Sequence, residues 1–318
     1  MKSLGKKIVL TVTRNRRKKK GRPVNGILLL DKPAGLSSNQ ALQKVKWLFR
    51  AQKAGHTGNL DLPATGLLPI CFGEATKMTT FLLDADKTYV ADVRLGINTS
   101  TLDASGEIVK TRPVPSYDRK DLEKVLERFR GRIIQIPPMY SALKHQGEPL
   151  YKLAREGKEV ERKERVQQIH HLEASNLSEN GFTIKVSCSK GTYIRTLAED
   201  IGEELGCGAH VLTLRRTRVG CFNIDKASTL DEIEQKDGKV EELDSLLLPV
   251  DAGLGSLPAV GLGEETAFYF LNGQRVMVPA IPREGLVRVY LPKARFLGIG
   301  EATGDGRIAP KRLISQEN

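Results

Sequence analysis

The segment from Gly55 to Gly66 constrains this chain most, because glycine begins it, interrupts it at position 58 and ends it. Glycine adopts backbone angles that other residues avoid, so the segment predicts a tight loop that lies close to a ligand. Asp61 is the only acid in the loop, and His56 precedes it. Charged loop residues are more often solvated than catalytic. Whether Asp61 is solvated or catalytic therefore has to be judged from the other motifs of the chain.

The N-terminal segment indicates a polyanionic partner. The 318 residues carry a formal net charge of +12, and no acid precedes Asp31 although lysine and arginine crowd the first 20 positions. Such runs are typical of arms that contact phosphate without reading base sequence. We expect a basic arm over residues 1–22. A targeting peptide is the alternative, but the lysine block suits an RNA-binding arm better.

Composition and spacing exclude several classes of protein. The four cysteines form no C-x-x-C pair, and the five histidines lack metal-ligand spacing, so we expect no metal site and a reducing compartment. No apolar run approaches the ~18 residues of a membrane span, which predicts a cytoplasmic protein without a membrane partner. The glycine patterns of nucleotide-phosphate loops and the G-x-S-x-G elbow are absent from the sequence.

Hydrophobic periodicity predicts a mixture of helices and strands. A continuous apolar run indicates a buried strand over residues 26–31, and alternation indicates half-buried strands over 87–96 and 182–188. Three segments carry apolar residues at helical spacing, and we expect helices there: residues 37–49, 118–130 and 194–205. The pattern lacks a regular β–α–β alternation, so the expected fold class is α+β.

Two stretches stand apart from this core. Residues 137–165 begin with two prolines and are dense in charge, which indicates a long excursion that is either functional or mobile. A glycine-rich linker is expected over residues 253–263. Beyond it, short strands over 286–291, 295–302 and 306–308 predict a small β-barrel. We therefore expect a domain over residues 23–251 and a second over 252–318.

Arg195 suggests a partner for Asp61. It follows Tyr193 where a strand is expected to give way to a helix, and a helix N-terminus favours anions. If Asp61 approaches Arg195, the ionised carboxylate is favoured and becomes available as a nucleophile or base. A phosphate contact or a surface ion pair is the alternative role for Arg195.

Six motifs occur in order along the chain. They are Gly26-Ile27-Leu28-Leu29-Leu30-Asp31-Lys32-Pro33 with Gly35 and Ser37-Ser38, Gly55-His56-Thr57-Gly58 with Leu60-Asp61, Lys87 with Tyr89, Pro138 with Tyr140-Ser141-Ala142, Lys190-Gly191-Thr192-Tyr193-Ile194-Arg195, and Leu214-Arg215-Arg216. Together they resemble the bacterial TruB-type tRNA pseudouridine synthases from about residue 25 to about residue 313. The closing segments 298–301 and 307–312 resemble that family's RNA-binding PUA barrel.

The resemblance implies both a fold and a reaction. The fold is a pseudouridine synthase catalytic core with a mixed, largely antiparallel sheet, plus a C-terminal PUA-like β-barrel. The reaction isomerises the uridine at position 55 in the T-loop of tRNA to pseudouridine, by base flipping and an aspartate-dependent glycosyl rearrangement. It is internal to the substrate, so no cofactor or metal is expected.

The same resemblance implies roles for individual residues. Asp61 is the catalytic aspartate, Tyr89 stacks on the flipped uracil, Tyr193 and Leu214 line the base pocket, Arg195 pairs with the aspartate, and His56 helps to hold the T-loop open. Residues 137–165 form a thumb-like loop that closes over RNA. The implied partner is the T-arm and T-loop of tRNA, without a guide RNA, and we expect a monomer.

The loop departs from the family pattern directly after the aspartate. The family order is Pro-Leu-Ala-Thr-Gly, whereas this chain has Leu62-Pro63-Ala64-Thr65-Gly66, with Asn59 ahead of Leu60. Proline restricts its own φ and the residue before it, so the constraint moves from Asp61 to Leu62. We hypothesise reduced activity with fold and RNA binding retained, and a tolerated variation is the alternative.

Two other functions remain open at this point. One is a tRNA-binding folding chaperone whose catalysis is impaired by the altered loop. The other is a guide-dependent relative that works in a ribonucleoprotein. The complete base-pocket set and residues 137–165 favour a stand-alone enzyme over the second.

Overall fold

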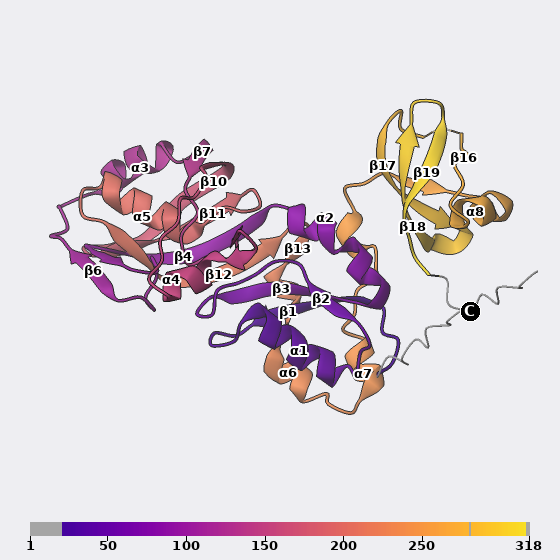
Figure 1. The fold of residues 1–318 in the computed structure, drawn as a ribbon, viewed down its shortest axis with the longest axis horizontal. Helices are drawn as coiled ribbons and strands as arrows, with labels where there is room; N and C mark the ends of the chain where they lie inside the picture. Colours follow the sequence, from indigo (N-terminus) through magenta and orange to yellow (C-terminus); the bar gives the residue numbers. More distant parts are fainter. Residues whose placement is uncertain (1–20, 280, 316–318) are drawn as a thin grey trace, which may run out of the picture.

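The structure is a computed structural model that describes residues 21–279 and 281–315. A large sheet with flanking helices forms one part of the molecule, and a smaller C-terminal sheet forms the other (Figure 1). Of the basic arm expected over residues 1–22, all but Gly21 and Arg22 lie outside the described residues.

The large sheet is mixed and mostly antiparallel, as the resemblance predicted. Its order is β14-β1-β3-β12-β4-β11-β10-β7, with β2 beside β3 and β13 beside β12, and the pairs β1–β14 and β3–β12 are parallel. Its strands are β1 (Gly26–Lys32), β2 (Ala54–His56), β3 (Thr65–Phe72), β4 (Lys87–Leu95), β7 (Gly131–Gln135), β10 (Arg165–Ser178), β11 (Gly181–Cys188), β12 (Ala209–Val219), β13 (Phe222–Asn223) and β14 (Ser228–Thr229).

Helices contribute to the two largest hydrophobic clusters of the core. The α-helices of the described residues are α1 (Ser38–Leu48), α2 (Thr79–Asp84), α3 (Arg119–Glu127), α4 (Leu150–Arg155), α5 (Ile194–Glu204), α6 (Leu230–Glu234), α7 (Val240–Asp244) and α8 (Glu264–Leu271). Helices α3 and α5 bury apolar side chains against β4, β10 and β11 in one cluster. Helices α1 and α6 do so against β1 and β3 in the other. Such burial is the main favourable term in folding.

The two clusters meet at the middle of the sheet. Tyr89 of β4 and Leu214 of β12 pack against both clusters. Strands β12 and β3 share the register pairs Arg215↔Thr65 and Arg216↔Gly66 there. The loop from Gly55 to Gly66 enters β3 at this point, so the fold places it at the junction of the two halves of the core.

Local sequence signals explain where the predicted helices begin and end. Ser37 caps α1 with a capping box, in which its side chain accepts from the backbone of Gln40. Helix α3 ends at Glu127, earlier than predicted, and Gly131 at φ +80° begins β7 instead of stopping the helix. Helix α5 ends at Glu204, and Gly206 follows it at φ +86°.

Residues 137–165 contain elements that the sequence did not predict. They form the hairpin β8 (Lys144–His145) and β9 (Glu148–Pro149), followed by α4. Elements this short contain too few residues to show a hydrophobic periodicity in the sequence. Arg162 Nη1 donates to the Pro137 carbonyl at 3.2 Å and so joins the two ends of the segment.

A five-stranded curled sheet with α8 forms the C-terminal part, which confirms the PUA-like unit. Its strands are β15 (Ala259–Gly261), β16 (Val276–Met277), β17 (Gly285–Leu291), β18 (Arg295–Thr303) and β19 (Arg307–Leu313). A separate hairpin in the first part of the molecule consists of β5 (Ile97–Thr99) and β6 (Ile108–Thr111). Strand β15 lies within the expected linker, because Ala259 to Gly261 pair with β17. The linker prediction over residues 253–263 was therefore wrong in part.

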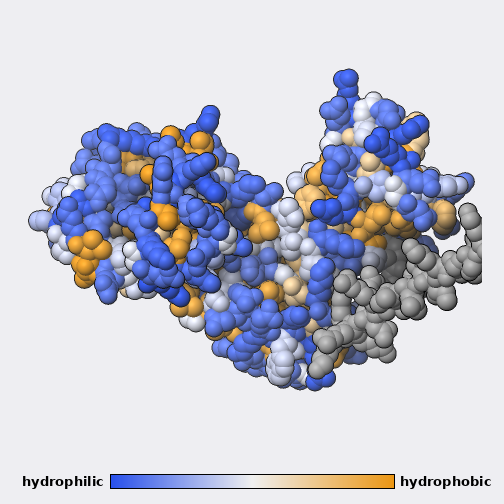
Figure 2. Space-filling model, viewed as in Figure 1, coloured by the Kyte–Doolittle hydropathy of each residue, from blue (hydrophilic) through white to orange (hydrophobic). Residues whose placement is uncertain are grey.

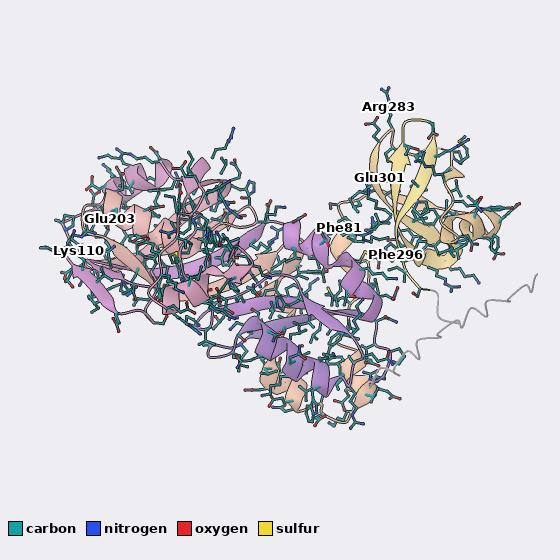
Figure 3. All side chains as sticks on the ribbon, viewed as in Figure 1. Phe81, Lys110, Glu203, Arg283, Phe296 and Glu301 are labelled. Carbon is teal, nitrogen blue, oxygen red and sulfur yellow. The ribbon has the colours of Figure 1, made fainter. Side chains whose placement is uncertain are left out.

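The two parts of the molecule touch through a small apolar cluster. Met78, Leu254 and Ile299 are buried in it, and Phe81 of α2 and Phe296 of β18 pack against them from the two sides (Figure 3). Figure 2 shows the hollow between the parts, and a cavity of about 780 Å³ lies there.

The described residues contain no helix long and apolar enough to cross a membrane. In the same ranges no group of three or more His, Cys, Asp or Glu is placed to hold a metal ion. Cys71, Cys188 and Cys207 are buried free thiols, and Cys221 is an exposed one.

Candidate active site

The loop around Asp61 is held by hydrogen bonds to the first turn of α1 and the turn before it. Ser38 Oγ accepts from the Leu60 backbone N–H at 2.8 Å, and Gly35 donates its N–H to the Leu62 carbonyl at 2.9 Å. Ala64 N donates to the Asp61 carbonyl at 3.1 Å, which closes a four-residue turn. The backbone that carries the carboxylate is therefore fixed on both sides.

Asp61 and Arg195 meet, as the sequence suggested. Arg195 Nε lies 3.0 Å from Asp61 Oδ2, and the Arg195 side chain is only 6% exposed. Its other nitrogens donate to the carbonyls of Thr101 at 2.7 Å and Tyr140 at 2.8 Å. Each nitrogen of the guanidinium thus has a partner, which fixes its orientation toward the carboxylate. The contact to Tyr140 also attaches the segment 137–165 to the site.

Asp103 is a second acid that the sequence analysis missed. Its Oδ2 lies 3.6 Å from Arg195 Nη1, and its Oδ1 accepts from Thr101 Oγ1 at 2.6 Å and from the Ser105 backbone N–H at 3.0 Å. The Asp103 side chain is 9% exposed. The signal was a turn-forming Thr-Leu-Asp-Ala-Ser-Gly stretch, which is typical of local carboxylate turns and does not by itself point to a distant arginine.

A cavity of about 290 Å³ lies beside the Asp61–Arg195 pair. Five of the six predicted site residues line it: Asp61, Tyr89, Tyr193, Arg195 and Leu214. Gln135, at the end of β7, holds the backbone of Tyr193 by accepting from its N–H at 3.0 Å and donating to its carbonyl at 3.1 Å. An open cleft of about 1350 Å³ also includes Asp61 and Arg195, with walls from α1 and α4.

His56 is the exception among the predicted site residues. It ends β2 and does not line the cavity or the cleft that contain Asp61. Burial, followed by the charge of Arg216, lowers the pKa of His56 below its usual value of 6.5. Its Nδ1 accepts from the Gly58 N–H at 3.4 Å, a long bond that fits a neutral ring.

Three cations lie near Asp61: Lys87 and Arg216 line the cavity, and the charge of Lys32 acts on Asp61. Burial lowers the pKa of Lys32 to about 8, and Arg216 adds to this shift while Asp61 opposes it. Burial and Arg216 likewise lower the pKa of Lys87 to about 8. The Lys32 ammonium donates to the Pro33 and Leu36 carbonyls at 2.8 and 2.7 Å. Lys32 and Lys87 belong to the sequence motifs, but no role was predicted for either residue.

Burial raises the pKa of Asp61 above its usual value, and Arg195 is the strongest opposing influence. Asp103 adds to the rise, whereas Lys32 opposes it. The Asp61 side chain is 43% exposed, and it borders both the cavity and the open cleft. The sequence analysis foresaw the stabilising effect of Arg195. Burial outweighs that effect, and only the structure shows this.

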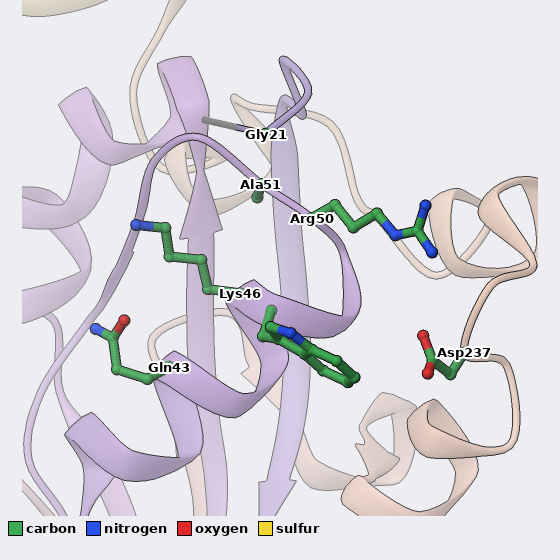
Figure 4. Close-up of a pocket in the computed structure, with 7 residues that line it drawn as sticks. Gly21, Gln43, Lys46, Arg50, Ala51 and Asp237 are labelled. Carbon is green, nitrogen blue, oxygen red and sulfur yellow. The ribbon is translucent and has the colours of Figure 1, made fainter. Parts of the chain in front are cut away.

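Another cavity, of about 550 Å³, lies away from this site. It is lined by α1 residues near Trp47 and by Asp237, and it contains none of the predicted site residues (Figure 4). The chemistry-bearing side chains therefore gather around Asp61. A carboxylate, a fixed guanidinium and two tyrosines suit nucleophilic or base chemistry on a planar ring.

Models of one family match the chain in three consecutive segments. The TruB family pseudouridylate synthase (N terminal domain) matches residues 46–194. The tRNA pseudouridylate synthase B C-terminal domain matches residues 195–255. The model described as pseudouridine synthase II TruB, C-terminal, matches residues 258–314.

Whole-chain comparisons agree with the family models. The tRNA pseudouridine synthase B of Stutzerimonas stutzeri is 55% identical over 93% of this chain and 97% of that protein. The protein of the same name from Pseudomonas aeruginosa is 56% identical over 92% and 97%. A chain in the crystal structure of a Cbf5-Nop10-Gar1 complex is 27% identical with a TM-score of 0.69, covering 92% of this chain and 84% of that one. The chain belongs to the TruB family of pseudouridylate synthases.

Proposed function

We propose that this protein converts the uridine at position 55 in the T-loop of tRNA to pseudouridine. The names of its relatives support tRNA as the substrate. The observation that carries the proposal is the Asp61–Arg195 pair, 3.0 Å apart, in a cavity that also holds Tyr89 and Tyr193.

The reaction is an isomerisation that balances without a co-reactant. The bond between N1 of uracil and C1′ of ribose breaks, the base rotates, and a bond forms between C5 and C1′. The hydrogen of C5 leaves to solvent as a proton, and N1 takes up a proton. Asp61 starts this sequence as an ionised carboxylate, by attacking C1′ or the base or by removing a proton from C2′.

Tyr89, Tyr193 and Leu214 would receive the base. A uridine in a folded T-loop has to leave its stack before its C1′ is accessible. A stacked aromatic side chain returns roughly 1–3 kcal/mol per base, and Tyr89 is placed to provide it at the junction of the two core clusters. We assign His56 to the space that the flipped base leaves, outside the cavity that receives it.

The remaining surfaces would bind the rest of the tRNA. We assign residues 137–165 to closing over the RNA, because Arg195 attaches this segment to the catalytic pair through Tyr140. We assign residues 252–318 to an RNA-binding PUA domain and residues 1–22 to a basic arm, with residues 23–251 as the catalytic domain. We expect a cytoplasmic monomer that needs no guide RNA.

The chaperone alternative has no specific observation in its favour. It rested on a disturbed Asp61, yet Asp61 lies 3.0 Å from Arg195 with the Leu62-Pro63 order in place. The geometry is that of a site able to react, so we propose the enzyme alone.

Mapping the modified position tests this proposal. Unmodified tRNA is incubated with the protein, treated with a carbodiimide that forms stable adducts with pseudouridine, and read by primer extension. We expect a single new stop at position 55, absent with the Asp61→Asn protein. A stop at another position, or the same stop with Asp61→Asn, would contradict the assignment.

A further inference from the structure

Arg216 is a buried arginine without a counter-charge. It is 1% exposed in the central strand β12, and none of the ion pairs among the described residues includes it. Its neighbour Arg215, by contrast, pairs with Asp31 at 2.6 Å and is 42% exposed. A buried guanidinium that lacks a carboxylate partner carries a large desolvation cost. The chain therefore retains Arg216 for something other than an ion pair.

The Arg216 guanidinium bridges the two ends of the catalytic loop. Its Nε donates to the Leu67 carbonyl at 2.8 Å, and its Nη1 donates to the Asn59 carbonyl at 3.2 Å. Asn59 precedes Asp61 in the loop, and Leu67 follows the loop at the start of β3. One planar group thus joins the entry and the exit of the segment that carries the reactive carboxylate.

The backbone of Arg216 is itself held between the two halves of the core. It is in register with Tyr89 on one side and with Gly66 on the other. The packing against Gly66 is so close that a Cβ there would lie 2.3 Å from the Arg216 carbonyl oxygen. The hydrogen bonds from Arg216 to the Asp61 loop therefore start from a closely packed point of the sheet, next to Tyr89, which lines the cavity.

Electrostatics agree with a role in the site. The charge of Arg216 contributes to the lowered pKa values of Lys32 and Lys87, after burial in both cases. Arg216 also lines the cavity with Asp61, and its Nη2 has no hydrogen-bond partner among the described residues. A neutral side chain could fill this space at lower cost, but it could not donate to two diverging carbonyls.

We propose that Arg216 is the positioning residue for Asp61: it ties both ends of the catalytic loop to β12 and keeps the carboxylate against Arg195 when a base enters. The proposal deepens the synthase function proposed above and rests on it. Arg216 acts through Asp61 and takes no part in bond making. Its loss should therefore reduce the rate of reaction and leave RNA binding nearly unchanged.

The test compares Arg216→Met and Arg216→Lys in the full chain. Misplacement of a reacting group by about 1 Å costs roughly 100-fold in rate, so we expect single-turnover pseudouridine formation to fall roughly 100-fold in both variants. The dissociation constant for tRNA should stay within about threefold. Lysine should not rescue, because all donors of its ammonium lie on a single atom and cannot occupy the separate positions of Arg216 Nε and Nη1.

Arg130→Lys is the matched control. Arg130 also donates its Nε to a backbone carbonyl, that of Leu172 at 3.0 Å, but it lines neither the cavity nor the cleft. It pairs with Glu123 of α3 at 2.6 Å. We expect this variant to react at the native rate, so a loss in it would point to general destabilisation.

Hydrogen–deuterium exchange provides a readout that does not depend on activity. Amides of residues 57–67 should exchange faster in both Arg216 variants than in the native and Arg130→Lys proteins, with the remaining core strands unchanged. Native exchange in this loop, or a rate within threefold of native, would overturn the proposal. So would a loss of tRNA affinity equal to the loss of rate. If the native protein forms no pseudouridine, the proposed function fails. Hydrogen–deuterium exchange still tests whether Arg216 holds the loop in place.

Discussion

The surroundings of Asp61 act on its ionised form in opposite directions. Arg195 and Lys32 favour its ionised form, whereas burial and Asp103 favour the neutral form, and the net effect is a raised pKa. A carboxylate that is costly to ionise in the folded protein is a reactive one, because the pocket solvates it poorly. The site therefore gives up some stability to hold a charged nucleophile or base in place.

Replacement of Asp61 by Asn should make this cost visible. Because the folded-state pKa of Asp61 is raised, ionisation weakens the native state at pH values above that pKa. Asp61→Asn should therefore have a higher unfolding midpoint than the native protein at pH 7. The advantage should shrink as pH falls through the folded pKa and vanish below the usual aspartate value. Thermal unfolding across that pH range checks this, and a variant less stable than native at pH 7 would contradict it.

Lys32 should tune the acid limb of the pH–rate profile. Its charge lowers the pKa of Asp61, so its removal raises that pKa further. The reaction needs the ionised carboxylate, and in Lys32→Met the rate should begin to fall at a higher pH than in the native protein. The single-turnover rate measured from pH 5 to 8 tests this. An acid limb that stays in place or moves to lower pH would show that Lys32 does not act on Asp61.

At the scale of elements, the turn after Asp61 is the point of departure from the family. The bond from Ala64 N to the Asp61 carbonyl places Leu62 and Pro63 at the two central positions of the turn. Proline favours the first central position and disfavours the second in the commonest turn type. The Leu62-Pro63 order is therefore less favourable for this turn than the family order. The hydrogen bonds of Leu60 and Leu62 to the first turn of α1 and to Gly35 still hold the loop.

Exchange of Leu62 and Pro63 should raise turnover. A proline at a compatible position stabilises by about 0.4–1 kcal/mol, equivalent to roughly twofold to fivefold if all of it reaches the transition state. Affinity for tRNA should hardly change, because the rest of the cleft stays the same. Steady-state kinetics of the protein with the two residues exchanged test this prediction. An unchanged turnover would mean that the Leu62-Pro63 order is tolerated.

Many of the helices and strands could be predicted from the sequence. Strands β1, β4 and β11 and helix α1 follow from clear periodicity and a capping box. Strand β12 was not predicted, because Arg215, Arg216 and Arg218 interrupt its apolar pattern. The partners of Arg215 and Arg216 come from distant segments of the chain. The pairing of Asp61 with Arg195 was suggested by chemistry. The contact of Asp103 with Arg195 was not predicted, because it arises only in the folded chain, where Asp103 pairs with Val211 of β12.

At the scale of the whole molecule, the site lies where two hydrophobic clusters share one sheet. Strands β3 and β12 join the halves, and the catalytic loop, Tyr89 and Leu214 all lie at this junction. The C-terminal sheet contacts Met78, directly before α2, through Ile299 and leaves the active-site cleft open. A long, folded RNA could therefore reach the cleft while the C-terminal sheet contacts another part of it.

The basic arm should supply much of the salt dependence of tRNA binding. Each phosphate contact by lysine or arginine releases counterions, so its removal reduces the slope of log affinity against log salt. A protein that lacks Met1 to Lys20 should bind tRNA more weakly at low salt and show a flatter slope. Binding measured from 50 to 300 mM salt tests this assignment. An unchanged slope would show that the arm does not contact the RNA.

The most direct test of the account is tritium release from tRNA labelled at C5 of uracil. Formation of the C5–C1′ bond expels that hydrogen, so release reports the rearrangement itself. We predict release by the native protein, none by Asp61→Asn, and none from a tRNA whose T-loop uridine is replaced by cytidine. Release by the Asp61→Asn protein, or no release by a native protein that binds tRNA tightly, would contradict the central claim that Asp61 in this cavity carries the isomerisation.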